Sequence, residues 1–93
     1  MSLKEIIQKK EATVIDVRNA DELAEGKFPG SLHIPVHEIP GRIAEISSMK
    51  APLVLYCRSG NRSNMAIMML KTAGLRHEMY NGGGLRDMQD LLN

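Results

Sequence analysis

Short apolar runs alternate along the chain with segments of helical periodicity. The runs TVIDV (residues 13–17) and LVLY (residues 53–56) have the length and character of strands, and the second suits a central strand buried on both faces. Shorter strands are expected over residues 32–34 and 77–80. Because strands that alternate with helices form βαβ units, the pattern predicts an α/β fold with a parallel sheet and helices on both faces. Ligands of such sheets bind beyond the carboxyl ends of the strands.

Helices are expected between these strands. Ser2 and Glu5 have the spacing of a capping box, which predicts a first helix over residues 2–10. A short helix that starts at residue 19 or 20 ends at Gly26. The remaining helices are expected over residues 36–46, 64–73 and 85–92.

The helix over residues 64–73 is apolar nearly all round, so we expect it to be buried and to end at Gly74. Three of its apolar side chains are expected in the core: Met65, Met68 and Met69. The run Asn81–Gly84 lacks the lysine of a phosphate-binding loop and predicts a flexible turn instead. Its glycines would let the backbone pass close beneath the loop that follows residue 56.

Length and composition exclude several classes of protein. A chain of 93 residues allows one compact domain, over residues 1–93. A net charge of +1, with two tyrosines, one phenylalanine and no tryptophan, argues against a nucleic-acid-binding surface. The longest apolar run is far shorter than a membrane span, and the N-terminus has no pattern of a secretory signal. We therefore expect a soluble, cytoplasmic domain that binds neither nucleic acid nor a membrane.

The polar segment after residue 56 combines several features that stabilise an anion. Gly60 permits a tight curl that turns backbone N–H groups inward, and the following helix adds its positive dipole end. Arg58 and Arg62 add two positive charges, and Arg62 is expected to face solvent at the end of the loop. Because such surroundings lower the pKa of a thiol, we expect Cys57 to be a thiolate nucleophile that is open to a second small anion.

Simpler interpretations exist for the same residues. A lone cysteine is usually a small buried apolar residue, and the residues after Cys57 are ordinary turn sequence. The preceding strand, the glycine, the two arginines and the following helix favour function. For Asp16 and Arg18, a salt bridge that braces the loop with Glu22 is a simpler role than direct catalysis.

A metal site is not expected. The chain has one cysteine, which excludes an intrachain disulfide and a multi-cysteine site. His33 and His37 are separated by Pro35, which makes a shared helical face unfavourable.

The string LVLYCRSGNRS, with DVRNADELAEGKFPGSLHIP before it and NGGG after it, resembles the single-domain rhodanese (thiosulfate sulfurtransferase) family. The resemblance covers nearly the whole chain. It implies a rhodanese-like, doubly wound parallel sheet of four or five short strands. It also implies a catalytic cysteine that carries a persulfide, with no cofactor and no metal.

Residue by residue, Cys57 matches the persulfide-bearing cysteine of the family. The resemblance implies that thiosulfate or another small anionic sulfur donor loads Cys57 and that cyanide or a thiol unloads it. A resolving cysteine would discharge the persulfide as a disulfide, so the absence of a second cysteine fits. Asp16 and Arg18 are candidate supporting residues. The loop residues that match the cradle of the outer sulfur are Arg58, Ser59, Gly60, Asn61 and Arg62.

Loop length separates this family from similar folds that act as phosphatases or arsenate reductases. Four residues lie between Cys57 and Arg62, whereas those enzymes have five between their cysteine and arginine. A smaller loop suits one sulfur atom better than a tetrahedral oxyanion. The sequence is also compatible with a sulfur-relay carrier that is loaded by a partner protein's persulfide. A non-catalytic domain is a further interpretation, and the retained cysteine and arginines argue against it.

Three features depart from the family pattern. Lys27 stands where many members have a histidine, and Met88 stands where many have a tryptophan. The usual short strand before the first helix is missing, which predicts either an exposed sheet edge or a fragment of a longer protein.

Overall fold

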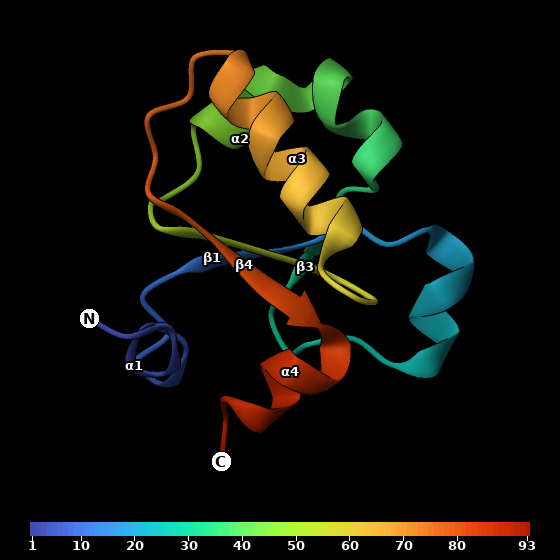
Figure 1. Ribbon diagram of the computed structural model, residues 1–93, viewed down its shortest axis with the longest axis vertical. Helices are drawn as coiled ribbons and strands as arrows, with labels where there is room; N and C mark the ends of the chain where they lie inside the picture. The colour runs from blue at the N-terminus through green and yellow to red at the C-terminus, as the bar shows by residue number, and fades with distance from the viewer.

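The computed structural model describes residues 1–93 and contains a four-stranded parallel sheet in the order β2-β1-β3-β4 (Figure 1). All three strand pairings are parallel, as the alternation of strands and helices predicts. The central strand β3 is buried at every residue because it pairs on both edges and is covered on both faces. The strands are β1 (Thr13–Asp16), β2 (Leu32–His33), β3 (Leu53–Cys57) and β4 (Met79–Gly84).

Helices cover both faces of this sheet, which confirms the doubly wound fold. Figure 1 shows α2 and α3 on one side of the strands and α1 and α4 on the other. The α-helices are α1 (Leu3–Gln8), α2 (Ile43–Ser47), α3 (Asn61–Thr72) and α4 (Leu85–Asp90), and the 3-10 helices are η1 (Ala20–Glu25) and η2 (Val36–Arg42). None of them combines the length and hydrophobicity that a membrane span requires.

Alternation along β3 builds one core on each face. Val54 and Tyr56 point into a cluster with residues of α1 and α4. Leu53, Leu55 and Cys57 point into a larger cluster with residues of η2, α2 and α3. The side-chain period of two along a strand therefore sends Cys57 to the face that α3 covers.

The capping box at the first helix is present as expected. The Ser2 hydroxyl accepts a hydrogen bond from the Glu5 backbone N–H, and the Glu5 carboxylate accepts one from the Ser2 N–H. The next helical segment, η1, ends at Gly26 with φ of 110°, a conformation that favours glycine.

Two expectations about the C-terminal half are wrong. The run Asn81–Gly84 belongs to strand β4, and a register irregularity opposite β3 between Leu55 and Cys57 accommodates its glycines. His77, expected to begin this strand, lies before it, and its Nε2 is 3.0 Å from the Met49 carbonyl oxygen. Pairing with a buried neighbour strand overrides the turn propensity of glycine.

The long helix α3 also differs from expectation. It begins at Asn61 rather than Asn64, directly after the loop that follows Cys57. Met65 and Met68 are 51% and 60% exposed, so they are not core residues, whereas Met69 packs against the larger cluster. The helix contacts the sheet along one face only. The apolar side chains on its other face therefore stay partly exposed.

Candidate functional site

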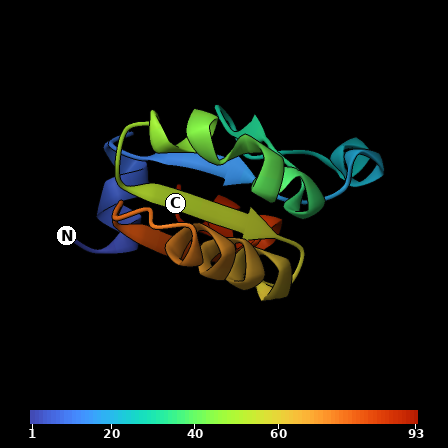
Figure 2. The same ribbon diagram turned by 90° about the horizontal axis from the view of Figure 1, so that it is seen from above.

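Cys57 is the last residue of β3 and opens the loop that leads into α3 (Figure 2). Gly60 precedes the helix with φ of 95°, a left-handed conformation that turns its own N–H back toward the cysteine. The Gly60 N–H donates a hydrogen bond to Cys57 Sγ at 3.0 Å, and Ser63 Oγ lies 3.6 Å from the same sulfur. The curled loop expected from the sequence is therefore present, with its amide directed at the thiol.

Opposing influences act on the acidity of this thiol. Burial raises the pKa of Cys57, but hydrogen bonds from the Ser63 side chain and from the backbone of Ser63, Ser59 and Gly60 outweigh it. The net pKa lies below the usual thiol value. The Ser63 hydroxyl has one proton, and Asn81 Oδ1 at 2.7 Å is a nearer acceptor than the sulfur. The Gly60 N–H is therefore the firmest donor to Sγ.

The position of the sulfur corrects one expectation. Cys57 has an exposed fraction of 0%, so it is not open to solvent. It is the end of a strand buried on both faces, and the loop folds over it. Cys57 nonetheless forms part of the wall of a pocket of about 480 Å³, whose other lining residues are Arg18, Glu25, Arg58, Leu85, Arg86, Gln89 and Asp90.

The two loop arginines have different surroundings. Arg58 is 70% exposed, and its nearest acidic partner, Glu25, is 3.9 Å away. Arg62 is not the free, solvent-facing residue that the sequence predicts, because the Glu22 carboxylate binds it through two hydrogen bonds of 2.5 and 2.9 Å. This pair ties η1 to the first turn of α3.

Asp16 and Arg18 form a buried ion pair beside the loop. Arg18 Nη2 lies 2.7 Å from Asp16 Oδ2, and both side chains are nearly unexposed. Burial raises the pKa of Asp16, but hydrogen bonds from Arg18 and Tyr56 outweigh it and keep this pKa below its usual value. Arg18 also donates to the carbonyls of Glu22 and Gly26.

These contacts refine the bracing role expected for the pair. Arg18 holds the backbone of η1, whereas the Glu22 carboxylate, expected to join Asp16 and Arg18, binds Arg62 instead. Asp16 and Arg18 are buried, and each side-chain nitrogen and oxygen of the pair has a protein partner, so their contacts are those of a structural brace.

The glycine run of β4 passes close beneath the loop, as the sequence predicts. A Cβ added at Gly84 would lie 2.2 Å from the Arg58 carbonyl oxygen, which leaves room for glycine alone. Asn81 supports the loop from the same strand, because its Nδ2 donates to the Gly60 carbonyl at 2.8 Å. Asn81 was missed as a site residue because its role depends on the pairing of β4 with β3. Ser63 was missed because its contact with Cys57 depends on how the first turn of α3 is placed.

Arg86, Gln89 and Asp90 of α4 also line the pocket and were not predicted from the sequence. Their spacing of three and four residues predicts only the polar face of an amphipathic helix, which is not specific to a site. Neither Arg86 nor Asp90 has a salt-bridge partner within 4.0 Å.

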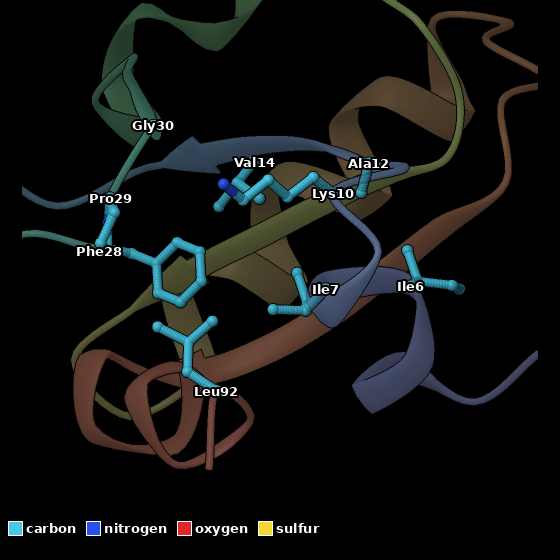
Figure 3. Close-up of a pocket in the computed structure, with 9 residues that line it drawn as sticks. All are labelled: Ile6, Ile7, Lys10, Ala12, Val14, Phe28, Pro29, Gly30 and Leu92. Carbon is cyan, nitrogen blue, oxygen red and sulfur yellow. The ribbon is translucent and has the colours of Figure 1, made fainter.

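A second pocket, of about 310 Å³, lies between α1 and the Phe28–Gly30 turn (Figure 3). Figure 3 shows Ile7, Phe28 and Leu92 around it and the Lys10 side chain extended across it. Its walls are mainly apolar, and it contains none of the sulfur-site residues. The Cys57 pocket differs in that most of its lining residues are polar or charged and Cys57 is among them.

The histidines make no metal site. His33 Nε2 lies 2.7 Å from the Arg18 carbonyl oxygen, and His37 is largely exposed beside Glu38. No group of three or more histidine, cysteine or acidic side chains lies close enough to hold a metal ion.

Comparisons with known proteins agree with this geometry. A sulfurtransferase of Allochromatium vinosum is 36% identical over 76 residues, with 82% of this chain and 70% of the relative covered. The thiosulfate sulfurtransferase PspE of Escherichia coli is 35% identical over 75 residues, covering 80% of this chain and 71% of the relative. The putative sulfur carrier protein YrkF of Bacillus subtilis is 32% identical over 74 residues, which span 80% of this chain but only 40% of YrkF.

The fold matches solved structures of the same kind. A rhodanese-related protein of Thermoplasma volcanium superposes with a TM-score of 0.74 at 32% identity, over 95% of this chain and 84% of that one. The relatives support sulfur transfer as the general chemistry of the site. The family model of the rhodanese-like domain matches residues 2–90, and the chain therefore belongs to the rhodanese-like domain family.

Proposed function

We propose that this protein moves sulfane sulfur from thiosulfate, or a similar small anionic donor, to cyanide or a thiol through a persulfide on Cys57. In the first step, the Cys57 thiolate attacks the outer sulfur of thiosulfate. A new S–S bond forms, the S–S bond of thiosulfate breaks, and sulfite leaves with the bonding electron pair. In the second step, the acceptor attacks the outer sulfur of the persulfide, and Cys57 leaves as the thiolate.

The single observation that carries the proposal is the Gly60 N–H directed at Cys57 Sγ from 3.0 Å, at the start of α3. A thiolate is the attacking group of the first step and the leaving group of the second. A site that stabilises it keeps Cys57 deprotonated for attack and makes it a better leaving group afterwards. Burial raises the pKa of Cys57, and hydrogen bonds from Ser63 and the loop backbone lower it by more. The lowered net pKa supports the thiolate form. The pathway needs no metal and no redox partner.

The other loop residues have distinct proposed roles. Arg58, exposed at the pocket, attracts the doubly charged donor and offsets charge as sulfite departs. The backbone of Ser59, Gly60 and Asn61 cradles the outer sulfur. Arg62 is a positioning residue, because Glu22 already occupies its guanidinium group. Asp16 and Arg18 support the cradle from behind rather than touch the donor.

Intact mass spectrometry after incubation with thiosulfate tests the proposal. We expect the mass of one added sulfur atom, its removal by cyanide with release of thiocyanate, and no gain in Cys57→Ser. An assay with an aryl phosphate is the control for phosphatase chemistry. Sulfur gain that persists in Cys57→Ser, or no gain from any sulfane donor, would contradict the proposal.

A second candidate function is that of a carrier loaded by the persulfide of a partner protein. The observation that favours it is the pair of exposed methionines, Met65 and Met68, on the helix that begins at the active loop, since methionine-rich surfaces adapt to protein partners. The relative YrkF is named as a putative sulfur carrier. If thiosulfate loads Cys57 slowly and the persulfide of a cysteine desulfurase loads it fast, the carrier function is favoured over the thiosulfate sulfurtransferase function.

A further inference from the structure

The pocket beside Cys57 carries charges of both signs, and two of them, Arg86 and Asp90, have no role in the proposed loading of Cys57. Arg86 and Asp90 line it from α4, a helix that contacts β3 and β4. Arg58 and Glu25 line the same pocket and lie 3.9 Å apart, a long separation between two exposed side chains. The pocket thus presents both a cationic and an anionic side chain within one hollow of about 480 Å³.

The charges on α4 lack protein partners. Arg86 and Asp90 are four residues apart, a spacing that permits an ion pair on a helix. They nevertheless form no salt bridge with each other or with any other residue within 4.0 Å. By contrast, Arg42 and Glu45, on a helical surface away from the pocket, pair at 2.8 Å. An unpaired guanidinium and an unpaired carboxylate in the pocket that Cys57 also lines are available to a ligand.

We infer that Arg86 and Asp90 select the sulfur acceptor, favouring a thiol that carries both a carboxylate and an ammonium group, as an amino acid or short peptide thiol does. The inference rests on the proposed persulfide of Cys57 and names its acceptor class. Arg86 binds the acceptor carboxylate, Asp90 binds its ammonium group, and the thiolate then faces the wall that contains Cys57. The thiolate attacks the outer persulfide sulfur, its S–S bond to Cys57 breaks, and Cys57 leaves as the thiolate.

Four small thiols separate the two charges. Cysteine carries both groups, 3-mercaptopropionate carries only the carboxylate, cysteamine carries only the ammonium group, and 2-mercaptoethanol carries neither. The assay starts from protein already loaded with sulfur, and stopped-flow or quenched mass spectrometry follows the loss of that sulfur. For each thiol, the rate with the variant is divided by the rate with the wild type. This ratio removes differences in intrinsic reactivity between the thiols, because that reactivity does not depend on the variant.

Arg86→Gln should slow unloading by cysteine and 3-mercaptopropionate about two- to fivefold, the size expected of a solvent-accessible ion pair. It should leave cysteamine and 2-mercaptoethanol unchanged. Asp90→Asn should slow cysteine and cysteamine by a similar factor and spare the other two thiols. Arg76→Gln and Asp21→Asn are matched controls, because both residues are exposed, lie outside the Cys57 pocket and have no salt bridge.

Equal rate ratios for all four thiols, whether lowered or unchanged, would overturn the inference. The loading of Cys57 with sulfur is measured in a separate experiment. A protein that does not load can therefore be distinguished from one that loads but does not select its acceptor. If thiosulfate does not load the protein, inorganic polysulfide supplies the persulfide and the acceptor test proceeds. If the rate of sulfur loss from Cys57 does not depend on the charge of the acceptor, Arg86 and Asp90 do not select the acceptor. The proposed sulfur transfer through Cys57 would still stand.

Discussion

Arginine has two different roles on the two sides of the active loop. On the η1 side, a brace formed by Asp16, Arg18, Glu22 and Arg62 has every guanidinium engaged by a carboxylate, and Arg18 is only 2% exposed. On the α4 side, the pocket mouth formed by Arg58, Arg86 and Asp90 has its charges exposed or without a partner. Engaged charges fix the position of the loop, and the proposed function assigns the free charges to an ionic substrate.

This difference matters for interpreting variants. Changes in the brace should alter stability first and sulfur transfer as a consequence. Changes at the mouth should alter sulfur transfer while stability stays nearly constant, because exposed side chains contribute little to folding. Variants of the brace and of the loop it supports test that division, and the largest effect is expected at the buried ion pair.

Asp16→Asn should be the most destabilising change, because it leaves the Arg18 guanidinium buried without a counter-charge. We expect a loss of about 3 kcal/mol or more in the free energy of unfolding, measured by urea denaturation. Glu45→Gln is the matched control: it breaks the surface pair with Arg42 and should cost less than about 1 kcal/mol. Equal losses in the two variants would show that the brace is not a buried structural unit.

Gly84→Ala should distort the active loop from below, because the new Cβ would overlap the Arg58 carbonyl oxygen. We expect about 1–3 kcal/mol of destabilisation and a large fall in the rate of persulfide formation in the folded fraction. Gly41→Ala is the control, since no atom lies within 4 Å of the added Cβ and its φ is not positive. A Gly84→Ala variant with the wild-type rate would mean that the loop does not need this close approach.

Glu22→Gln and Arg62→Ala should each lower stability by about 1 kcal/mol, and the double variant should add little, because both remove one ion pair. The hydrogen bonds from Arg62 lower the pKa of Glu22 from 4.5 to about 2. A pKa depressed by folding gives stability that is fully present above pH 4.5 and is lost as the pH falls toward 2.

The denaturation midpoints of wild type and Glu22→Gln should therefore differ at neutral pH and converge in acid. A difference that does not change with pH would contradict the ion pair. Arg62→Ala should also slow sulfur transfer, but only as far as Glu22→Gln does, because both release η1 from the start of α3. A much larger effect of Arg62→Ala would give Arg62 direct contact with the donor.

Local patterns in the sequence predict much of this site. The apolar run of β3, the loop glycine and the helix that follows are encoded within a short stretch, so they place Cys57 at the end of a central strand. The same holds for the capping box of α1. These features need only neighbouring residues, and all are present in the structure.

The remaining features depend on residues far apart in the sequence. Arg62 and Glu22 are 40 positions apart, and only the folded chain shows that they meet. The glycines of β4 have low strand propensity, and pairing with β3 determines their conformation. Met65 and Met68 lie on a helix face that the fold leaves half exposed, which composition alone does not reveal. Arg86 enters the pocket because α4 packs beside β4.

Titration of the Cys57 thiol is the most direct test of the proposed chemistry. As the chain has one cysteine, the ultraviolet absorbance of the thiolate, taken as the difference between wild type and Cys57→Ser, follows this group alone. We expect a pKa below 9.0, the usual value for a cysteine thiol, because the hydrogen bonds from Ser63 and the loop backbone outweigh burial. A pKa at or above that value would contradict a loop that stabilises the thiolate.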